Sequence, residues 1–290
     1  MFRRYVSLFI CSFIFSTSIF ASDPTVLIAI LARNKAHFLP TFLQCINNLE
    51  YDKKSISIYI NTNNNEDDTV EILEEWMNKH RSQYRNIEME QHEIKDLDNT
   101  LPHEWTVPRF KILGAIRNKS LAKTKEHHCD YYFVVDCDNF IKPNTLKILV
   151  QKAKPIIAPM LRSIPRKHST YSNFFCDITE TGYYQPHEDY YPILHRKKIG
   201  TFQAPVVHCT YLIDSKYVDQ LSYLDGTDDY EFVIFSRIAR QKQIEQFICN
   251  EVNFGVLWEW DPLGQNQKIT LAQERELFAN YLKDHPDFLK

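Results

Sequence analysis

The chain lacks several features that would assign it to a common class of protein. Its Lys and Arg residues are scattered rather than clustered, and its formal net charge is -3, which argues against a nucleic-acid-binding protein. It has no Cys-x-x-Cys pair and no His/Cys cluster, so a structural zinc site is not expected. It also has no internal repeat, low-complexity tract or linker. With 290 residues, 44% of them hydrophobic, the chain is expected to bury a substantial core in one large domain.

A hydrophobic run long enough to span a membrane is also missing. Residues 5–20 are apolar, but this run is short, follows Arg3 and Arg4, and ends before the small residue Ala21. That pattern is typical of a secretory signal peptide over residues 1–21. We therefore expect an exported protein with no stable membrane span after cleavage; an uncleaved anchor is the alternative.

Cysteine usage leaves two interpretations open. Of seven cysteines, one lies in residues 1–21 and six remain at wide spacings. An even number in an exported chain permits disulfides. Several of the six lie in expected core strands, where free, buried thiols fit the sequence equally well.

The most informative stretch runs from Tyr131 to Asn139. Residues 131–135 are large and apolar or aromatic, so they are expected to form a buried strand that leads directly into Asp136 and Asp138. Two carboxylates this close repel each other unless a cation lies between them. A hard divalent ion such as Mn2+ or Mg2+ is the natural partner, and it would in turn hold a diphosphate. A strand-terminating Asp-Cys-Asp-Asn turn is the alternative.

Strands and helices alternate four times before residue 160. The expected strands are 25–31, 56–60, 87–93, 131–135 and 155–160, and the expected helices are about 40–49, 69–80, 109–126 and 143–152. This alternation implies parallel βαβ units in a doubly wound, three-layer α/β/α sandwich with a mainly parallel sheet.

In such sheets, ligands bind outside the carboxyl ends of the strands. The polar segments that follow three of the expected strands, at 33–34, 61–68 and 136–139, should therefore meet at one edge. Within the second of them, Asp68 and Glu71 form a capping-box pattern, with Asp68 as the N-cap of the next helix.

The second half is less regular. Residues 162–196 are expected to form long loops or short antiparallel strands. A strand over 204–214 contains His208, and a helix opens at 228–231. A core strand at 244–249 and a closing helix at about 270–284 complete the chain.

Six segments match a known family in order and with few gaps: 26–34, 69–76, 134–140, 158–160, 171–174 and 207–214. They resemble the N-terminal glycosyltransferase domain of the procollagen galactosyltransferases and of the related cerebral endothelial cell adhesion molecule. The resemblance implies a single GT-A domain over 22–290, a UDP-hexose donor (UDP-galactose in the family) and Mn2+. It also implies transfer to an acceptor hydroxyl on a protein or glycan, such as hydroxylysine in collagen-like chains.

The resemblance also implies roles around the two aspartates. Asp138 would ligate the metal directly, and Asp136 would contact the ribose or ligate the metal through water. Arg33 and Asn34 would border the uracil and ribose, with an ordinary solvated loop as the alternative.

Two further donor-binding candidates come from neighbouring elements. Asp67 or Asp68 would read the uracil edge, although Asp68 is equally explained as a helix cap. Arg117, on the helix before the metal strand, would approach the diphosphate or donor sugar, with a surface salt bridge as the alternative.

Inverting transfer needs a general base to take the acceptor proton. In GT-A enzymes this carboxylate commonly lies at the start of a helix after the acceptor strand, where this chain has Asp229 and Glu231. Glu231 is the first choice and Asp229 the second; helix capping is the alternative role.

A third metal ligand is harder to assign. No His lies between Cys249 and His285, so His208 is the candidate, with a hydrogen-bonded core histidine as the alternative. Aromatic residues, namely Trp105, Tyr183 and Tyr184, would stack on sugar or acceptor, or anchor loops.

The leading hypothesis is an exported, metal-dependent UDP-sugar transferase. A catalytically inactive binding or adhesion protein with the same fold is the alternative, and a metal-dependent hydrolase is a third. The resemblance implies the lumen of the endoplasmic reticulum and secretory pathway for a eukaryotic protein. The C-terminal residues 287–290 carry no Lys/Arg-Asp-Glu-Leu signal, so a bacterial periplasmic or secreted protein stays open.

Overall fold

The structure is a computed structural model, and it describes residues 23–95, 101–265 and 268–288. The expected signal peptide lies outside the described residues. No helix in the part of the chain that the structure describes combines the length and the apolar character needed to cross a membrane.

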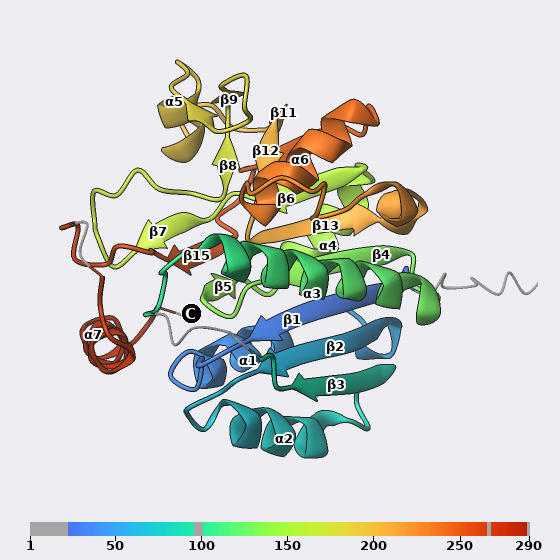
Figure 1. The fold of residues 1–290 in the computed structure, drawn as a ribbon, viewed down its shortest axis with the longest axis vertical. Coiled ribbons are helices and arrows are strands. Elements are labelled where there is room, and N and C mark those ends of the chain that lie inside the picture. The colour runs from blue at the N-terminus through green and yellow to red at the C-terminus, as the bar shows by residue number, and fades with distance from the viewer. Residues whose placement is uncertain (1–22, 96–100, 266–267, 289–290) are drawn as a thin grey trace, which may run out of the picture.

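A large mixed sheet forms the centre of the molecule (Figure 1). Its strands are β1 (Val26–Ala32), β2 (Ile56–Asn63), β3 (Asn86–His92), β4 (Tyr131–Val135), β6 (Ile156–Pro159), β11 (Thr201–Gln203), β13 (Thr210–Asp214) and β14 (Gln246–Cys249). They lie in the order β11-β14-β6-β13-β4-β1-β2-β3. The pairs β1–β2, β1–β4, β2–β3 and β6–β14 are parallel, whereas β13 runs antiparallel to both its neighbours.

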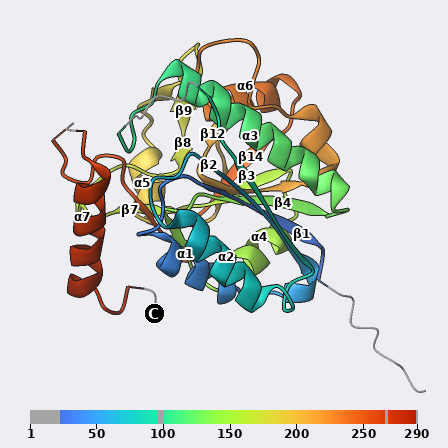
Figure 2. The ribbon, with the colours of Figure 1, turned by 60° about the horizontal axis from the view of Figure 1, so that its bottom comes forward.

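Helices cover both faces of this sheet, as Figure 2 shows: α1 (Leu39–Asn47), α2 (Thr69–His80) and α4 (Thr145–Lys152) on one face, and α3 (Val107–Glu126) and α6 (Glu231–Gln241) on the other. The structure also has α5 (Tyr190–Leu194) and α7 (Leu271–Asp284). One core packs alternate β1 residues such as Ile28 against α1, α2 and α4, and a second packs Leu27 and Ala29 against α3 and α6. Burial on both faces explains why β1 has an unbroken apolar sequence. The predicted three-layer GT-A fold is confirmed by solved structures of the same fold.

Small sheets extend the second half of the chain. They are β5 (Asn139–Ile141), β15 (Gly255–Trp258) and β7 (Arg162–Ile164) in one sheet, β8 (Phe174–Phe175) with β12 (Val206–Val207), and β9 (Asp177–Ile178) with β10 (Tyr184–Gln185). Two 3-10 turns cover Lys53–Ser55 and Ser215–Gln220. The six cysteines of the described chain are all unpaired, so the free-thiol interpretation is correct for this structure.

Two local predictions are wrong. The expected strand at 204–214 breaks between β12 and β13, because Cys209 has a positive φ of 64° and the backbone turns away there. Asp68 precedes α2 but makes no capping hydrogen bond. Asp67 does this instead, accepting hydrogen bonds from the Thr69 N–H at 3.1 Å and from the Thr69 hydroxyl at 2.5 Å.

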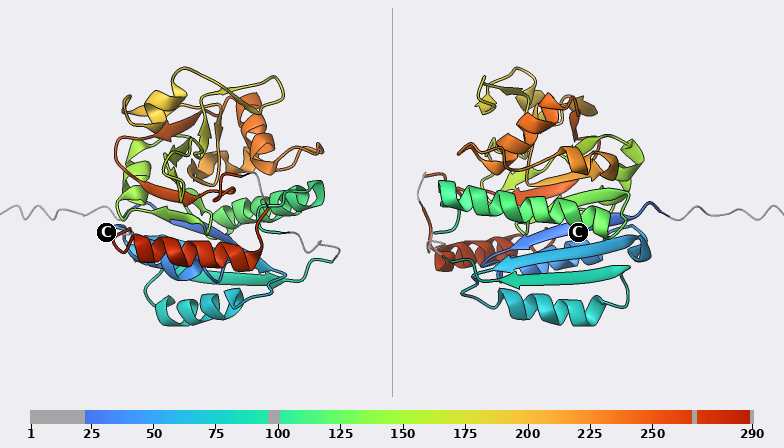
Figure 3. Two further views of the ribbon diagram at one scale, coloured as in Figure 1. Left: turned by 90° about the vertical axis from the view of Figure 1, so that its left-hand side faces the viewer. Right: turned by 45° about the vertical axis from the view of Figure 1, so that its right-hand side comes forward.

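Helix α7 crosses the edge at which the parallel strands end, as the left view of Figure 3 shows. Phe278 is fully buried and fastens the helix there, with ring centroids 4.6 Å from Phe38, 5.4 Å from Phe140 and 5.3 Å from Trp258. Such aromatic contacts are worth about 0.5–1.5 kcal/mol each beyond the area they bury. The closing helix therefore forms part of the ligand-binding edge.

Candidate functional site

A cavity of about 760 Å³ opens at the carboxyl ends of β1, β2 and β4. The polar segments after these strands all contribute to its lining, as the fold class predicted. Helix α3 supplies another wall through Ile112, Leu113 and Ile116, so its apolar side is partly a cavity wall. Helix α7 and the loop before α3 add Glu274, Trp105 and further residues.

Asp136 and Asp138 both line this cavity. Asp136 receives a hydrogen bond from the Arg117 guanidinium at 2.9 Å. Burial raises the pKa of Asp136 above its ordinary value, with Arg117 opposing the shift and Asp138 adding to it. The structure therefore brings the two carboxylates into the electrostatic contact that their spacing predicted.

Asp138 pairs with a residue that sequence reasoning missed. The Lys35 ammonium donates to the Asp138 carboxylate at 3.0 Å, and the two side chains are 20% and 18% exposed. Burial lowers the pKa of Lys35, but Asp138 and Glu274 more than offset that effect, so the net pKa lies above its ordinary value. Lys35 is therefore a cation that the protein itself places beside Asp138.

Arg117 joins the aspartate pair to the start of α6. Its side chain is 6% exposed, and its Nε lies 3.5 Å from a carboxylate oxygen of Glu231. The alternative of a surface salt bridge is wrong, because Arg117 is buried between two carboxylates and above the Tyr223 ring. Its position on α3, beside Asp136, fixes the Asp136 side chain.

The two candidate bases differ in their surroundings. Burial raises the pKa of Glu231, although Arg117 opposes the shift. Asp229 is bound by the Tyr183 hydroxyl at 2.9 Å and by Arg237 at 2.8 Å. Burial tends to raise the pKa of Asp229, but these hydrogen bonds outweigh it and the net pKa is lowered. Neither carboxylate lines the cavity, although Tyr230 and Phe232, which flank Glu231, do.

Arg33 and Asn34 line the cavity, as expected. Asn34 ties the first two strand exits together, because its N–H donates to Asn65 at 2.8 Å and its side chain accepts from the Glu66 N–H at 2.8 Å. Asp68 does not line the cavity. Its neighbour Asp67 is bound instead by the Ala36 N–H and by Arg275 of α7.

His208 lies behind the cavity wall. It is 3% exposed and packs against Tyr171 and Phe232, whose side chains face the cavity. Burial and the nearby Arg117 lower the pKa of His208 to about 3, so the ring is neutral. Its Nδ1 lies 2.9 Å from the Cys209 sulfur, and its Nε2 has no hydrogen-bond partner.

Helix α7 contributes a buried carboxylate that sequence reasoning also missed. Glu274 is 1% exposed, lines the cavity, and is bound by His103 at 2.7 Å and by His37 at 3.2 Å. Burial tends to raise its pKa, but the two imidazoles and Lys35 lower it well below the ordinary range. The local signal for Glu274 is its place in the first turn of α7, where the helix dipole favours an acidic residue.

Of the three aromatic candidates, Trp105 lies at the cavity, whereas Tyr183 and Tyr184 are not part of its lining. Trp105 is 42% exposed at the cavity and stacks with the Arg109 guanidinium at 4.7 Å. Trp260, which was not predicted, also lines the cavity. Tyr183 and Tyr184 do not line it; they contact Asp229 and the rings of Phe175 and Tyr190.

The cavity suits a hard divalent ion. Asp136 and Asp138 present carboxylate oxygens to the cavity, and oxygen ligands are those that Mn2+ and Mg2+ prefer. Asp138 already binds the positive charge of Lys35, which shows that the position favours a cation.

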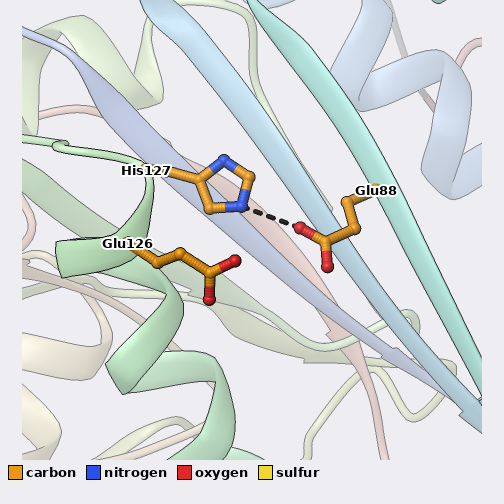
Figure 4. A group of neighbouring side chains, drawn as sticks. All are labelled: Glu88, Glu126 and His127. Carbon is orange, nitrogen blue, oxygen red and sulfur yellow. Dashed lines mark hydrogen bonds and ion pairs between the residues drawn. The ribbon is translucent and has the colours of Figure 1, made fainter.

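A different cluster, Glu88, Glu126 and His127, places three ligand atoms within 4.8 Å of one another at the far end of α3 (Figure 4). His127 donates to Glu88 at 2.8 Å, and Lys123 binds Glu88 at 2.6 Å and Glu126 at 3.0 Å. Lys123 thus neutralises both carboxylates, and the cluster is a salt-bridge network between α3 and β3.

Solved structures share this fold. S. aureus TarS 1-349 superposes with a TM-score of 0.53 at 13% identity, covering 91% of this chain and 72% of that one. The mannosyltransferase PcManGT from Pyrobaculum calidifontis, solved with GDP-Man and Mn2+, has a TM-score of 0.50 at 12% identity, covering 91% and 75%. These superpositions show that the chain has a GT-A fold, and its cavity lies at the strand ends.

Sequence comparison then gives the family. The family model "Glycosyltransferase family 25, N-terminal domain" matches residues 23–281, and the chain belongs to that family. It is 37% identical over 265 residues to human procollagen galactosyltransferase 2, covering 88% of this chain and 41% of the relative. It is 35% identical over 268 residues to procollagen galactosyltransferase 1-A of Xenopus laevis, covering 89% and 43%. The chain therefore spans about two fifths of the length of these curated relatives, and the predicted family is confirmed.

Proposed function

We propose that the chain is a metal-dependent glycosyltransferase that moves a hexose, galactose in the first instance, from a UDP-sugar to an acceptor hydroxyl with inversion. The observation that carries this proposal is the paired carboxylates, Asp136 and Asp138, facing a cavity at the strand ends of a family 25 chain. Support for the donor comes from the same fold in TarS, which has been solved in complex with UDP-GlcNAc. Support for galactose comes from the names of the relatives.

Each group on the donor side has a proposed task. Asp138 and Asp136 would hold Mn2+ or Mg2+, which when bound supplies positive charge to the leaving diphosphate. Arg33 and Asn34 would border the nucleoside at the exit of β1. Arg117 would hold Asp136 in place from α3, because it binds that carboxylate at 2.9 Å.

Glu231 is the proposed general base, with Asp229 as the second choice. A base works best when its pKa lies near the working pH. Burial raises the pKa of Glu231, whereas that of Asp229 is lowered by its bonds to Arg237 and Tyr183. His208 is the proposed third metal ligand, because its ring is neutral and its Nε2 has no hydrogen-bond partner.

The acceptor is proposed to be a protein or glycan hydroxyl, hydroxylysine of a collagen-like chain included. Residues 22–290 would act as one catalytic unit after export directed by residues 1–21, in the secretory pathway of a eukaryote or the envelope of a bacterium. The matched relatives are procollagen galactosyltransferases, which supports this acceptor class.

A donor screen tests the proposal. Purified protein is mixed with UDP-hexoses with and without Mn2+, and both thermal shift and UDP release are measured. We expect stabilisation and UDP release with one UDP-hexose only when Mn2+ is present. Binding without release, with acceptor present, would instead indicate an inactive binding protein, and neither effect with any UDP-sugar would refute the enzyme.

A further inference from the structure

Each carboxylate of the Asp136–Asp138 pair already has a cationic partner, but the two partners differ in kind. Arg117 is buried on a helix and held by two carboxylates, Asp136 and Glu231. Lys35 lies on the segment after β1, lines the cavity, is one-fifth exposed, and pairs its ammonium with Asp138. Arg117 is therefore a fixed, buried part of the fold, whereas Lys35 lies in the cavity that a ligand would enter.

We propose that Lys35 occupies the cation position at Asp138 in the nucleotide-free protein and excludes free divalent metal from it. The metal then enters together with a nucleoside diphosphate, whose phosphate oxygens take over the Lys35 ammonium. This inference rests on the proposed function, because it concerns the metal and donor of the same site.

The geometry allows such an exchange. The Lys35 N–H donates to the Thr69 hydroxyl at 2.8 Å, which holds the backbone in place. The ammonium stands at the end of a flexible four-carbon stem, so it can change partner by side-chain rotation alone. An ammonium and a divalent ion repel each other, so both cannot share Asp138 without additional negative charge. A diphosphate brings that charge, and its oxygens serve as ligands for a metal and as acceptors for a lysine.

A second carboxylate, Glu274, stabilises the Lys35 ammonium at its position beside Asp138. Glu274 of α7 acts on Lys35 electrostatically as well, and is itself held by His37 and His103. Lys35 is therefore paired with a carboxylate from the turn after β4 and attracted by a second one from α7, and all three residues line the cavity. A divalent ion arriving alone would have to break this arrangement without a replacement partner for the lysine.

The test is an Mn2+ titration without nucleotide, followed through the electron paramagnetic resonance signal of free Mn2+. Wild-type protein is compared with Lys35→Gln and with Lys35→Arg, which keeps the charge. We expect Lys35→Gln to bind Mn2+ about ten- to a hundredfold more tightly than wild type, because the metal no longer displaces a charged hydrogen bond. Lys35→Arg should behave as wild type.

Two control variants identify the site. Lys152→Gln removes a comparable ion pair, with Glu251 at 2.6 Å, away from the cavity, and should leave Mn2+ binding unchanged. The double variant Lys35→Gln/Asp138→Asn should lose the tight binding that Lys35→Gln gains. Equal Mn2+ affinity of wild type and folded Lys35→Gln would overturn the proposal, as would tight binding that survives the Asp138 change.

The same titration with UDP separates this inference from the proposed function. Wild type should bind Mn2+ at least about tenfold more tightly when UDP is present. This comparison needs no variant, so it tests the Lys35 proposal even if Lys35→Gln does not fold. Equal Mn2+ affinity with and without UDP would refute that proposal. UDP-dependent binding of Mn2+ with no sugar transfer would overturn only the catalytic proposal, and no Mn2+ binding under any condition would overturn both.

Discussion

Helix α3 carries two charge clusters of similar composition in different surroundings. Arg117, in the middle of the helix, binds Asp136 and Glu231 beside the cavity. Lys123, six residues later, binds Glu88 and Glu126 near the C-terminal end of the helix. Figure 4 shows these two carboxylates with His127. Both clusters join α3 to other parts of the fold through carboxylates, so composition alone does not distinguish them.

Solvation distinguishes them. Burial raises the pKa of Asp136 and of Glu231 despite the nearby Arg117. Burial has the same tendency at Glu88, but hydrogen bonds from Lys123 and His127 outweigh it and the pKa is lowered. The carboxylates of the Arg117 cluster are poorly solvated and lie beside a cavity, so their charges can act on a bound ligand. The charges of the second, outer cluster, formed by Lys123, Glu88, Glu126 and His127, neutralise one another.

Among the changes beside the cavity, Asp138→Asn should cause the largest loss of activity. The change removes a charge that the metal and the diphosphate need, so we expect UDP-hexose turnover to fall by about 1,000-fold. The measurement is UDP release at saturating Mn2+. Glu126→Gln at the outer cluster is the matched control and should stay within twofold of wild type; a similar loss in both would erase the distinction between the clusters.

Glu231→Gln should lower kcat by about 100-fold, because the acceptor proton would have no base. Folding is checked by the thermal midpoint, since the change also alters the contact with Arg117. In wild type the acidic limb of the kcat profile should lie above the ordinary Glu range. The base must be deprotonated, and its pKa is raised, so activity is lost as pH falls through that raised value. A larger loss in Asp229→Asn than in Glu231→Gln would reverse the order of the two candidates.

Arg117→Met should cost about 3–5 kcal/mol of unfolding free energy, because it leaves two carboxylates without their buried partner. Lys123→Met, the matched change at the outer cluster, should cost about 1 kcal/mol or less, because the carboxylates it leaves, Glu88 and Glu126, are 30% and 62% exposed and water can solvate them. Chemical denaturation of both variants provides the values. Equal costs would show that the two clusters are solvated alike.

Glu88→Gln should have the smallest effect, about 0.5–1 kcal/mol near neutral pH, with no change in UDP or Mn2+ binding. The pKa of Glu88 is lowered by folding, so its stabilising contribution is present above the unfolded pKa and is lost as pH falls through the folded pKa. The stability difference between wild type and variant should therefore shrink towards acid. A difference that grows towards acid would contradict the pairing with Lys123 and His127.

Several elements were predictable because their signal is local. The strand at 131–135 is observed as β4 and the helix at 69–80 as α2, with the predicted bounds. Both have strong apolar periodicity and polar residues at their ends. The meeting of the strand exits at one cavity followed from the alternation of strands and helices, which leaves few topologies open.

Other features depended on contacts distant in sequence. Cys209 breaks a run that reads as one strand, because β12 pairs with β8 while β13 joins the main sheet. Glu274 looked like an ordinary acidic residue in a helix first turn, and Lys35 like a loop lysine. Glu274 reaches the cavity because α7 packs across the strand ends through Phe278. Lys35 meets Asp138 because β1 and β4 are parallel neighbours whose exits lie together.

The sequence by itself determined the doubly wound class and the paired aspartates, since periodicity and spacing are properties of short segments. The family followed from the likeness of six segments to known relatives. Only the tertiary structure decided which cation each aspartate meets: Arg117 from α3 for Asp136, and Lys35 from the exit of β1 for Asp138. The physical reason is that burial and charge pairing depend on distances between segments about 20 to 100 residues apart, which no local pattern encodes.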